Sequence, residues 1–137
     1  MTAGETHERG MEVRREVLGH DYVDASMERT TPFTADFQDL ITRYAWGEIW
    51  TRPGLDRKTR SCITLTALMA RGQLEELALH VRAALRNGLT EEEIKEVFLH
   101  GAIYCGVPAA RGAFAVAQRV LAEGPGSQEE VTEDQGD

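Results

Sequence analysis

Cysteine is scarce in this sequence. The two cysteines, Cys62 and Cys105, lie far apart and form no CxxC pair, so we expect neither the disulfide framework of a secreted domain nor a cysteine-built zinc site. We expect both to be buried as small hydrophobic side chains rather than to act as nucleophiles.

Long hydrophobic runs are also missing. No apolar stretch approaches the roughly 20 residues that a membrane-spanning helix needs. The opening MTAGETHERG lacks the apolar core of a signal peptide. We therefore expect a cytoplasmic protein that neither crosses nor binds a membrane.

Basic residues are outnumbered by acidic ones. Lys and Arg total 15 against 23 Asp and Glu, which gives a net charge of −8 and a pI near 5.0. A nucleic-acid partner is not expected, because phosphate binding needs a basic face, and an acidic membrane surface would repel the chain. An anionic substrate would require a local cluster of arginines.

The sequence does contain enough apolar material for one domain, since 42% of its 137 residues are hydrophobic. No segment alternates with period two, so the expected fold class is all-α. Capping residues, prolines and glycines divide the chain into about six helices. We expect them at about 6–18, 31–50, 57–71, 73–87, 90–105 and 107–121.

Three segments are expected outside the helices. Residues 1–10 are polar and predict a frayed, disordered N-terminus, residues 20–30 indicate a loop, and the acidic segment 124–137 indicates a disordered tail. The folded domain should therefore span residues 11–123. In the helix that begins at Thr31-Pro32, an apolar stripe is expected to face the core: Phe33, Phe37, Leu40, Ile41 and Tyr44.

His80 is the first candidate for chemistry. Glu76 stands one helical turn before it, and a carboxylate beside an imidazole raises its pKa and fixes its tautomer. Such a pair suits a general acid or base. The alternative is a histidine at the core boundary that hydrogen-bonds a neighbouring helix.

His100 is a second candidate. It shares one strip of its helix with Glu93, Glu96 and Tyr104, which allows a catalytic or binding role. A metal site is not expected there, because no third ligand stands at a useful spacing.

Arginines and tryptophans cluster in the middle of the chain. Arg52, Arg57 and Arg60 follow the segment WGEIW; they are either solvated helix ends or, Arg60 above all, forked donors for a carboxylate substrate. Trp46 and Trp50 stand one helical turn apart. They predict either a pocket wall that excludes water or a core or interface anchor.

Two runs of this sequence resemble the carboxymuconolactone decarboxylase family: AWGEIWTRPGLDRKTRSCITL and ELALHVRAALRNGLTEEEIKEVFLHGAIYCGVPAARGAF. The resemblance implies an all-helical, alkylhydroperoxidase-D-like domain that is homo-oligomeric, usually a trimer or hexamer, with pockets near the subunit contacts. It also implies cofactor-independent decarboxylation of 4-carboxymuconolactone, a dicarboxylate lactone, to the β-ketoadipate enol-lactone in protocatechuate catabolism.

The resemblance also suggests roles for the site residues. His80 would be the general acid or the oxyanion donor, Glu48 would orient it or shuttle a proton, and Arg60 would hold a carboxylate or the carbonyl oxygen. The polar and apolar walls of the pocket would be His100, Tyr104, Trp46 and Trp50. No metal or coenzyme is expected, because the substrate's lactone carbonyl accepts the electrons.

Three other functions stay open at this point. A sibling branch of the superfamily reduces peroxides with a CxxC pair near a histidine, whereas Glu75, Glu76 and Leu77 stand just before His80 here. The second is a non-catalytic binding or assembly protein on the same fold. The third is a related decarboxylase or lactone-processing enzyme with another substrate.

Overall fold

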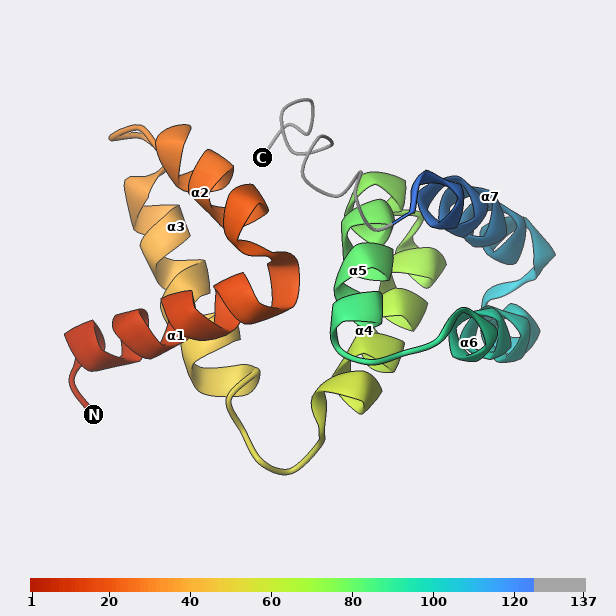
Figure 1. Ribbon diagram of the computed structural model, residues 1–137, viewed down its shortest axis with the longest axis horizontal. Coiled ribbons are helices and arrows are strands. Elements are labelled where there is room, and N and C mark those ends of the chain that lie inside the picture. The colour runs from red at the N-terminus through yellow and green to blue at the C-terminus, as the bar shows by residue number, and fades with distance from the viewer. Residues whose placement is uncertain (125–137) are drawn as a thin grey trace.

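The helices of this protein lie in two layers. In the computed structural model, which describes residues 1–124, these residues form seven α-helices, one π-helix and no strand, so the predicted all-α class is confirmed. Figure 1 shows α1, α2 and α3 on one side and α4 to α7 on the other, joined by the loop that leads into α4. None of the described helices is long and apolar enough to cross a membrane. The predicted tail lies outside the described residues, apart from Gly124.

The N-terminal layer begins earlier than the sequence predicts. Its elements are α1 (Ala3–Leu18), α2 (His20–Glu28), α3 (Ala35–Ile41) and the π-helix η1 (Thr42–Ile49). The N-terminus is not disordered as predicted, because a capping box between Thr2 and Glu5 starts α1 at Ala3, the third residue of the chain. The cap satisfies backbone N–H groups that would otherwise have no partner.

The loop expected at residues 20–30 is wrong, because α2 occupies it. Gly19, at φ 97°, turns the chain between α1 and α2, a backbone conformation that favours glycine. Tyr22, Val23 and Ser26 are then buried, and their spacing is helical. This apolar spacing is present in the sequence, but it covers too few residues to predict a helix.

The inward stripe predicted for the helix that begins at Thr31-Pro32 is wrong for four of its five residues. The exposed fractions are 94% for Phe33, 60% for Phe37, 49% for Leu40 and 59% for Tyr44, whereas Ile41 is half-buried. Thr42, Trp46 and Gly47 are buried instead. The chain passes from α3 into a π-helix at Thr42, whose wider turn changes the spacing from that residue onward and so accounts for Tyr44. Phe33, Phe37 and Leu40 precede the π-helix, and their exposure has no explanation in its spacing.

The C-terminal layer follows the predicted helices closely. It contains α4 (Arg57–Arg71), α5 (Leu74–Arg86), α6 (Glu91–Cys105) and α7 (Val107–Glu123). The side chain of Asp56 caps α4, Gly72 ends it in the left-handed conformation, and Thr90 with Glu93 forms a capping box on α6. The four helices pack around one apolar core, which includes Leu65, Leu77, Ile94 and Phe98.

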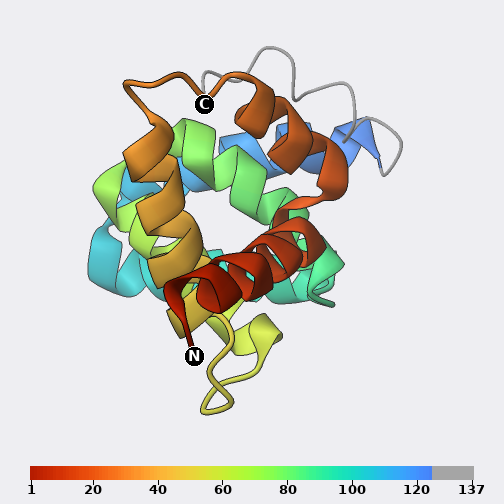
Figure 2. The same ribbon diagram turned by 90° about the vertical axis from the view of Figure 1, so that its left-hand side faces the viewer.

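The two layers meet on α5. One side of this helix contributes Leu77, Val81 and Ala84 to the C-terminal core, and the other contributes Leu79 and Ala83 to a second core shared with α1, α2 and η1. Figure 2, viewed from the N-terminal layer, shows α1, α2 and α3 as a frame in front of the remaining helices. The edges of α5 between its two apolar faces are therefore where polar side chains can lie between the layers.

Candidate active site

One edge of α5 carries the histidine predicted to react. At about 100° per residue, Glu76, His80 and Asn87 project from the same side of this helix, between its two apolar faces. The His80 side chain is only 13% exposed, whereas Glu76 is half-exposed, and Glu76 Oε2 lies 4.0 Å from His80 Nε2. This separation is too long for a direct hydrogen bond.

The structure corrects the expected protonation of His80. Burial lowers its pKa from 6.5 to about 4, because a desolvated site disfavours the charged form. The expectation that Glu76 raises this pKa is wrong, since the half-exposed carboxylate is too distant to offset burial. His80 is therefore a neutral imidazole at neutral pH, which can donate one hydrogen bond and accept another.

Two tryptophans lie next to the same part of α5. Trp46 and Trp50 stack with ring centroids 5.2 Å apart and planes 26° apart. Trp46 is 7% exposed and shares the second core with Leu79 and Ala83, and Trp50 packs against that core. The aromatic stack therefore packs on the apolar face of α5 that Leu79 and Ala83 form. Leu79 directly precedes His80 in the sequence.

Arg60 stands near the start of α4, which lies beside the end of α5. Asn87 Nδ2 donates a hydrogen bond to Ser61 Oγ at 2.8 Å, which sets α4 beside the end of α5. His80 stands seven residues before Asn87, so it lies about 10 Å from Asn87 along the axis of α5. Arg60 Nη2 instead donates to the Arg52 carbonyl at 2.9 Å and ties the loop after η1 to α4.

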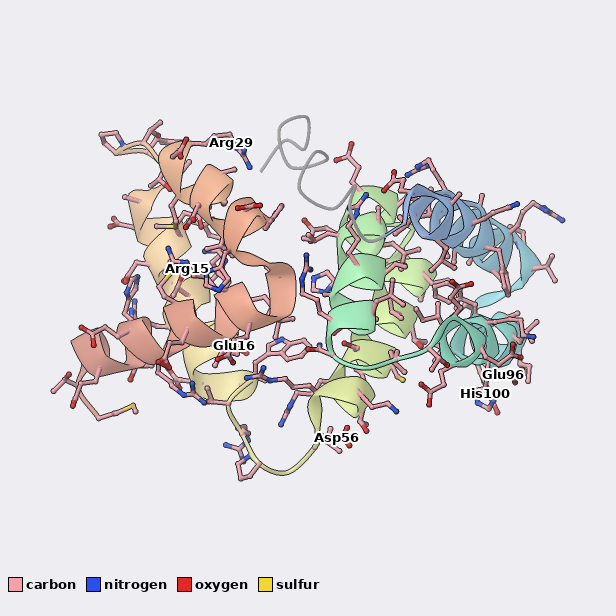
Figure 3. All side chains as sticks on the ribbon, in the orientation of Figure 1. Arg15, Glu16, Arg29, Asp56, Glu96 and His100 are labelled. Atoms are coloured by element: carbon pink, nitrogen blue, oxygen red, sulfur yellow. The ribbon has the colours of Figure 1, made fainter. Side chains whose placement is uncertain are left out.

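Within residues 1–124, no side-chain hydrogen bond or ion pair joins the other three predicted site residues to His80. The side chain of Glu48 is exposed on η1 and makes no hydrogen bond or ion pair with the described residues. The His100 and Tyr104 rings lie 5.6 Å apart on α6, and Tyr104 is 79% exposed. Figure 3 shows His100 with Glu96 at the end of the molecule opposite α1. A single chain therefore does not bring His100 and Tyr104 to His80.

The model of the carboxymuconolactone decarboxylase family matches residues 35–119, a range that contains the tryptophan stack, Arg60 and His80. The chain belongs to this family. It is 43% identical over 134 residues to the 4-carboxymuconolactone decarboxylase of Acinetobacter baylyi, a match that covers 98% of this chain and 100% of the relative. It is 47% identical over 124 residues to the nitrosuccinic acid decarboxylase npaB of Metarhizium robertsii, covering 88% of this chain and 87% of the relative.

In this member of the carboxymuconolactone decarboxylase family, the cysteines are poorly placed for peroxide chemistry. Cys62 on α4 and Cys105 at the end of α6 are both free and half-buried. Burial, together with the nearby Glu93 and Asp56 carboxylates, raises the pKa of the Cys62 thiol, so the reactive thiolate is disfavoured. Residues 1–124 also contain no group of three or more His, Cys, Asp or Glu side chains that could hold a metal ion.

Two pockets of this family member lie elsewhere. One, of about 420 Å³, lies between α6 and α7 and includes Ile94, Phe98 and Phe114. The other, of about 380 Å³, lies between α5 and α7 beside Arg82 and Arg86. Neither is lined by the predicted site residues, so neither is the candidate active site.

The sequence interpretation missed the burial of Arg14 on α1. This side chain is 3% exposed and hydrogen-bonds to Thr42 at the start of η1. A signal existed, because Arg14 stands between Val13 and Val17 on a helix face that is otherwise apolar. A charged residue in such a position is rarely buried without a specific partner.

Proposed function

We propose that this protein decarboxylates 4-carboxymuconolactone. The observation that carries the proposal is the 43% identity to a 4-carboxymuconolactone decarboxylase over 98% of this chain and 100% of the relative. The geometry supports it with a desolvated, neutral His80 on α5, the helix whose residues Leu79 and Ala83 share a core with Trp46 of the stacked tryptophan pair. Such a site favours charge delocalised in a dry environment over charge held in water.

The reaction needs little more than electrostatic help. The substrate is an unsaturated lactone with two carboxylates. When the bond from the ring carbon to its carboxylate breaks, carbon dioxide leaves, and the electron pair moves through the ring double bond onto the lactone carbonyl oxygen. A proton then adds to a ring carbon and gives the enol-lactone. The protein must hold two carboxylates, stabilise the oxyanion and deliver one proton.

The protonation state of His80 favours one of its two predicted roles. A neutral imidazole is a weak acid but a good hydrogen-bond donor, so we assign His80 to the developing oxyanion rather than to proton delivery. Glu48, which is exposed, would shuttle the proton from solvent to the ring carbon. Arg60 would hold a substrate carboxylate, and the Trp46–Trp50 stack would exclude water.

The proposed enzyme is a cytoplasmic homo-oligomer, a trimer or hexamer. Large apolar side chains are exposed on α3, on the turn before it and on η1 at one end, and on α6 at the other, among them Phe33, Phe37, Leu99 and Ile103. Figure 1 shows α3 and α6 at opposite ends of the molecule, and pairing of two different faces closes a ring where the rotation between subunits returns to the first one. A neighbouring subunit would then bring His100 and Tyr104 to the site. Sedimentation equilibrium measures the subunit number.

A second candidate substrate is nitrosuccinic acid, because npaB, a decarboxylase named for it, is 47% identical to this chain. Its name describes a dicarboxylic acid with a nitro group, which is also an electron sink for decarboxylation. Two carboxylates and one developing negative charge make the same demands on His80 and Arg60. The two substrates differ in shape, so their relative rates separate the two proposals.

Turnover of the purified protein tests the function. Loss of the lactone absorbance should require no added metal or coenzyme and should continue in the presence of a chelator. H80Q should fold normally and lose about 10²- to 10³-fold in kcat, the usual effect of removing one oxyanion donor. The matched control is H20Q, which removes an exposed histidine of α2 and should keep wild-type turnover.

The remaining outcomes decide among the alternatives. A wild-type protein that leaves the lactone intact but consumes nitrosuccinic acid would replace the first substrate by the second. Consumption of peroxide with oxidation of the thiols would instead indicate the alternative function, a peroxidase on the same fold. If H80Q matched the wild-type rate on the lactone, the role given to His80 would be wrong even though the function stood.

A further inference from the structure

The N-terminal layer contains a buried polar cluster that the proposed chemistry does not use. Arg14, Ser26 and Thr42 are 3%, 3% and 0% exposed, and they come from α1, α2 and η1. Within residues 1–124 no carboxylate bonds to Arg14, and its hydrogen-bond partners are the neutral side chains of Ser26, Met27, Gln38 and Thr42. A buried cation held by neutral groups is destabilised by desolvation, so its retention calls for a specific role.

The contacts of Arg14 converge on the start of the π-helix. Nη1 donates to Gln38 Oε1 at 3.1 Å and to Thr42 Oγ1 at 3.3 Å, and Nη2 donates to Ser26 Oγ at 3.5 Å. Thr42 Oγ1 in turn donates to the Gln38 carbonyl at 2.7 Å. One guanidinium thereby joins α1, α2 and α3 at the residue where α-helical spacing gives way to π-helical spacing.

Glycine contacts hold the rest of η1 against α1. A Cβ on Gly10 would overlap the Thr42 carbonyl oxygen, and a Cβ on Gly47 would lie 2.6 Å from the Thr6 carbonyl oxygen. The backbones of α1 and η1 therefore touch at two points. With its first residue fixed by Arg14 and its middle fixed by glycine contacts, η1 has little freedom to rotate back to α-helical spacing.

We propose that Arg14 is a positioning residue, whose guanidinium fixes the register of η1 and thereby the orientation of Trp46 and Glu48. Trp46 lies one turn after Thr42 and stacks on Trp50, and Glu48 stands on the same π-helix. π-Helical segments are rare and frequently occur at functional sites. The catalytic half of this inference rests on the proposed function, whereas the structural half does not.

The variant R14M tests the inference, because methionine fills similar space but donates no hydrogen bond. Loss of register should abolish the exciton couplet that the stacked tryptophans give in circular dichroism. It should also lower kcat on the lactone by about 10²-fold, the effect of a misplacement near 1 Å, with a smaller change in KM. The matched control is R82M: Arg82 is 7% exposed and pairs with Glu123 at 3.2 Å, on the opposite edge of α5.

R82M should lose stability but keep both the couplet and the kcat of the folded protein. R14M that also keeps both, after correction for the folded fraction, would overturn the proposal and leave Arg14 with a purely structural role. If R14M does not fold, T42V replaces it, because it removes the hydroxyl that Arg14 contacts and should weaken the couplet. If the wild-type protein leaves the lactone intact, the catalytic half fails, while a couplet lost in R14M but not in R82M still supports the register half.

Discussion

The two layers of this protein have different interiors. The C-terminal layer is built around apolar side chains such as Leu65 and Phe98, both 0% exposed, and its buried Arg82 pairs with the Glu123 carboxylate. The N-terminal layer also has an apolar core, but it buries Arg14 among neutral partners and brings two backbones into contact at Gly10. Apolar side chains can shift to accommodate a change, whereas a hydrogen-bonded cation and touching backbones permit one geometry. The layer with the more specific interior is also the layer that carries η1.

The helix ends show a smaller difference. Side-chain caps start α1 in the N-terminal layer and α4 and α6 in the C-terminal layer, while α2, α3, η1, α5 and α7 have no side-chain cap hydrogen bond. Short uncapped helices are marginal on their own. The short helices α2 and α3 therefore depend on contacts with their neighbours, whereas the uncapped helices of the C-terminal layer, α5 and α7, have 13 and 17 residues.

The largest difference between the layers should follow from adding one methyl group. In G10A the new Cβ would overlap the Thr42 carbonyl oxygen and lie 3.0 Å from the Gly47 nitrogen, both backbone atoms. We expect a loss of about 3 kcal/mol or more in the free energy of unfolding, because overpacking against backbone has no cheap relief. Urea denaturation followed by circular dichroism measures it.

The C-terminal layer offers two matched controls. In G112A the Cβ meets only Leu74 side-chain atoms, the nearest at 3.6 Å, so the helix preference of alanine should stabilise α7 by about 0.5–1 kcal/mol. In G101A the Cβ meets the flexible end of Met69, and the expected change in the free energy of unfolding lies between the loss in G10A and the gain in G112A. Equal losses in G10A and G101A would contradict the proposed difference between the interiors.

The sequence predicts the C-terminal layer well for a physical reason. Helix α4 begins after a capping aspartate and ends at Gly72, and α6 begins with its capping box. These local signals agree with the apolar spacing, so each element is specified by its own residues. In the N-terminal layer, α2 is short, and η1 is set by Arg14 and Gly10, which lie far from it in sequence. Neither contact is visible in a local pattern.

The candidate site is also predictable only in part. Helical spacing correctly places the Trp46–Trp50 pair one turn apart, and the structure shows them stacked. Spacing also pairs Glu76 with His80, but it does not reveal how deeply the imidazole is buried, so the predicted direction of its pKa shift is wrong. The roles of Glu48, Arg60, His100 and Tyr104 remain predictions, because they depend on substrate and on neighbouring subunits.

His80, at the junction of the layers, should give the next largest effect, and it depends on pH. Its pKa of about 4 in the folded protein lies below the ordinary value of 6.5. Between these values the unfolded chain binds a proton that the folded protein does not. The stabilising contribution is therefore complete above about pH 6.5 and lost as the pH falls to about 4, by about 3 kcal/mol in total.

Comparison with H80Q isolates this contribution. Other groups titrate in both proteins, so the difference between their free energies of unfolding, measured in urea from pH 7 to pH 4, reports His80. The wild-type protein should lose stability relative to H80Q as the pH falls through this range. Parallel curves would show that the imidazole is not desolvated and would remove the reason for calling His80 neutral.

The smallest effect compares one motif in both layers. Thr90 with Glu93 on α6 and Thr2 with Glu5 on α1 form the same capping box. T90A should lower the free energy of unfolding by about 1 kcal/mol, because the first turn of α6 leads directly to Ile94, which is 1% exposed. T2A should cost less, since residues 1–5 are exposed and that turn can fray without opening a core. Urea denaturation measures both losses, with T90S as the control that keeps the hydroxyl. A larger loss in T2A than in T90A would mean that the first turn of α1 contributes at least as much to the stability of the fold as the first turn of α6. The N-terminal layer would then not depend on its tertiary contacts alone.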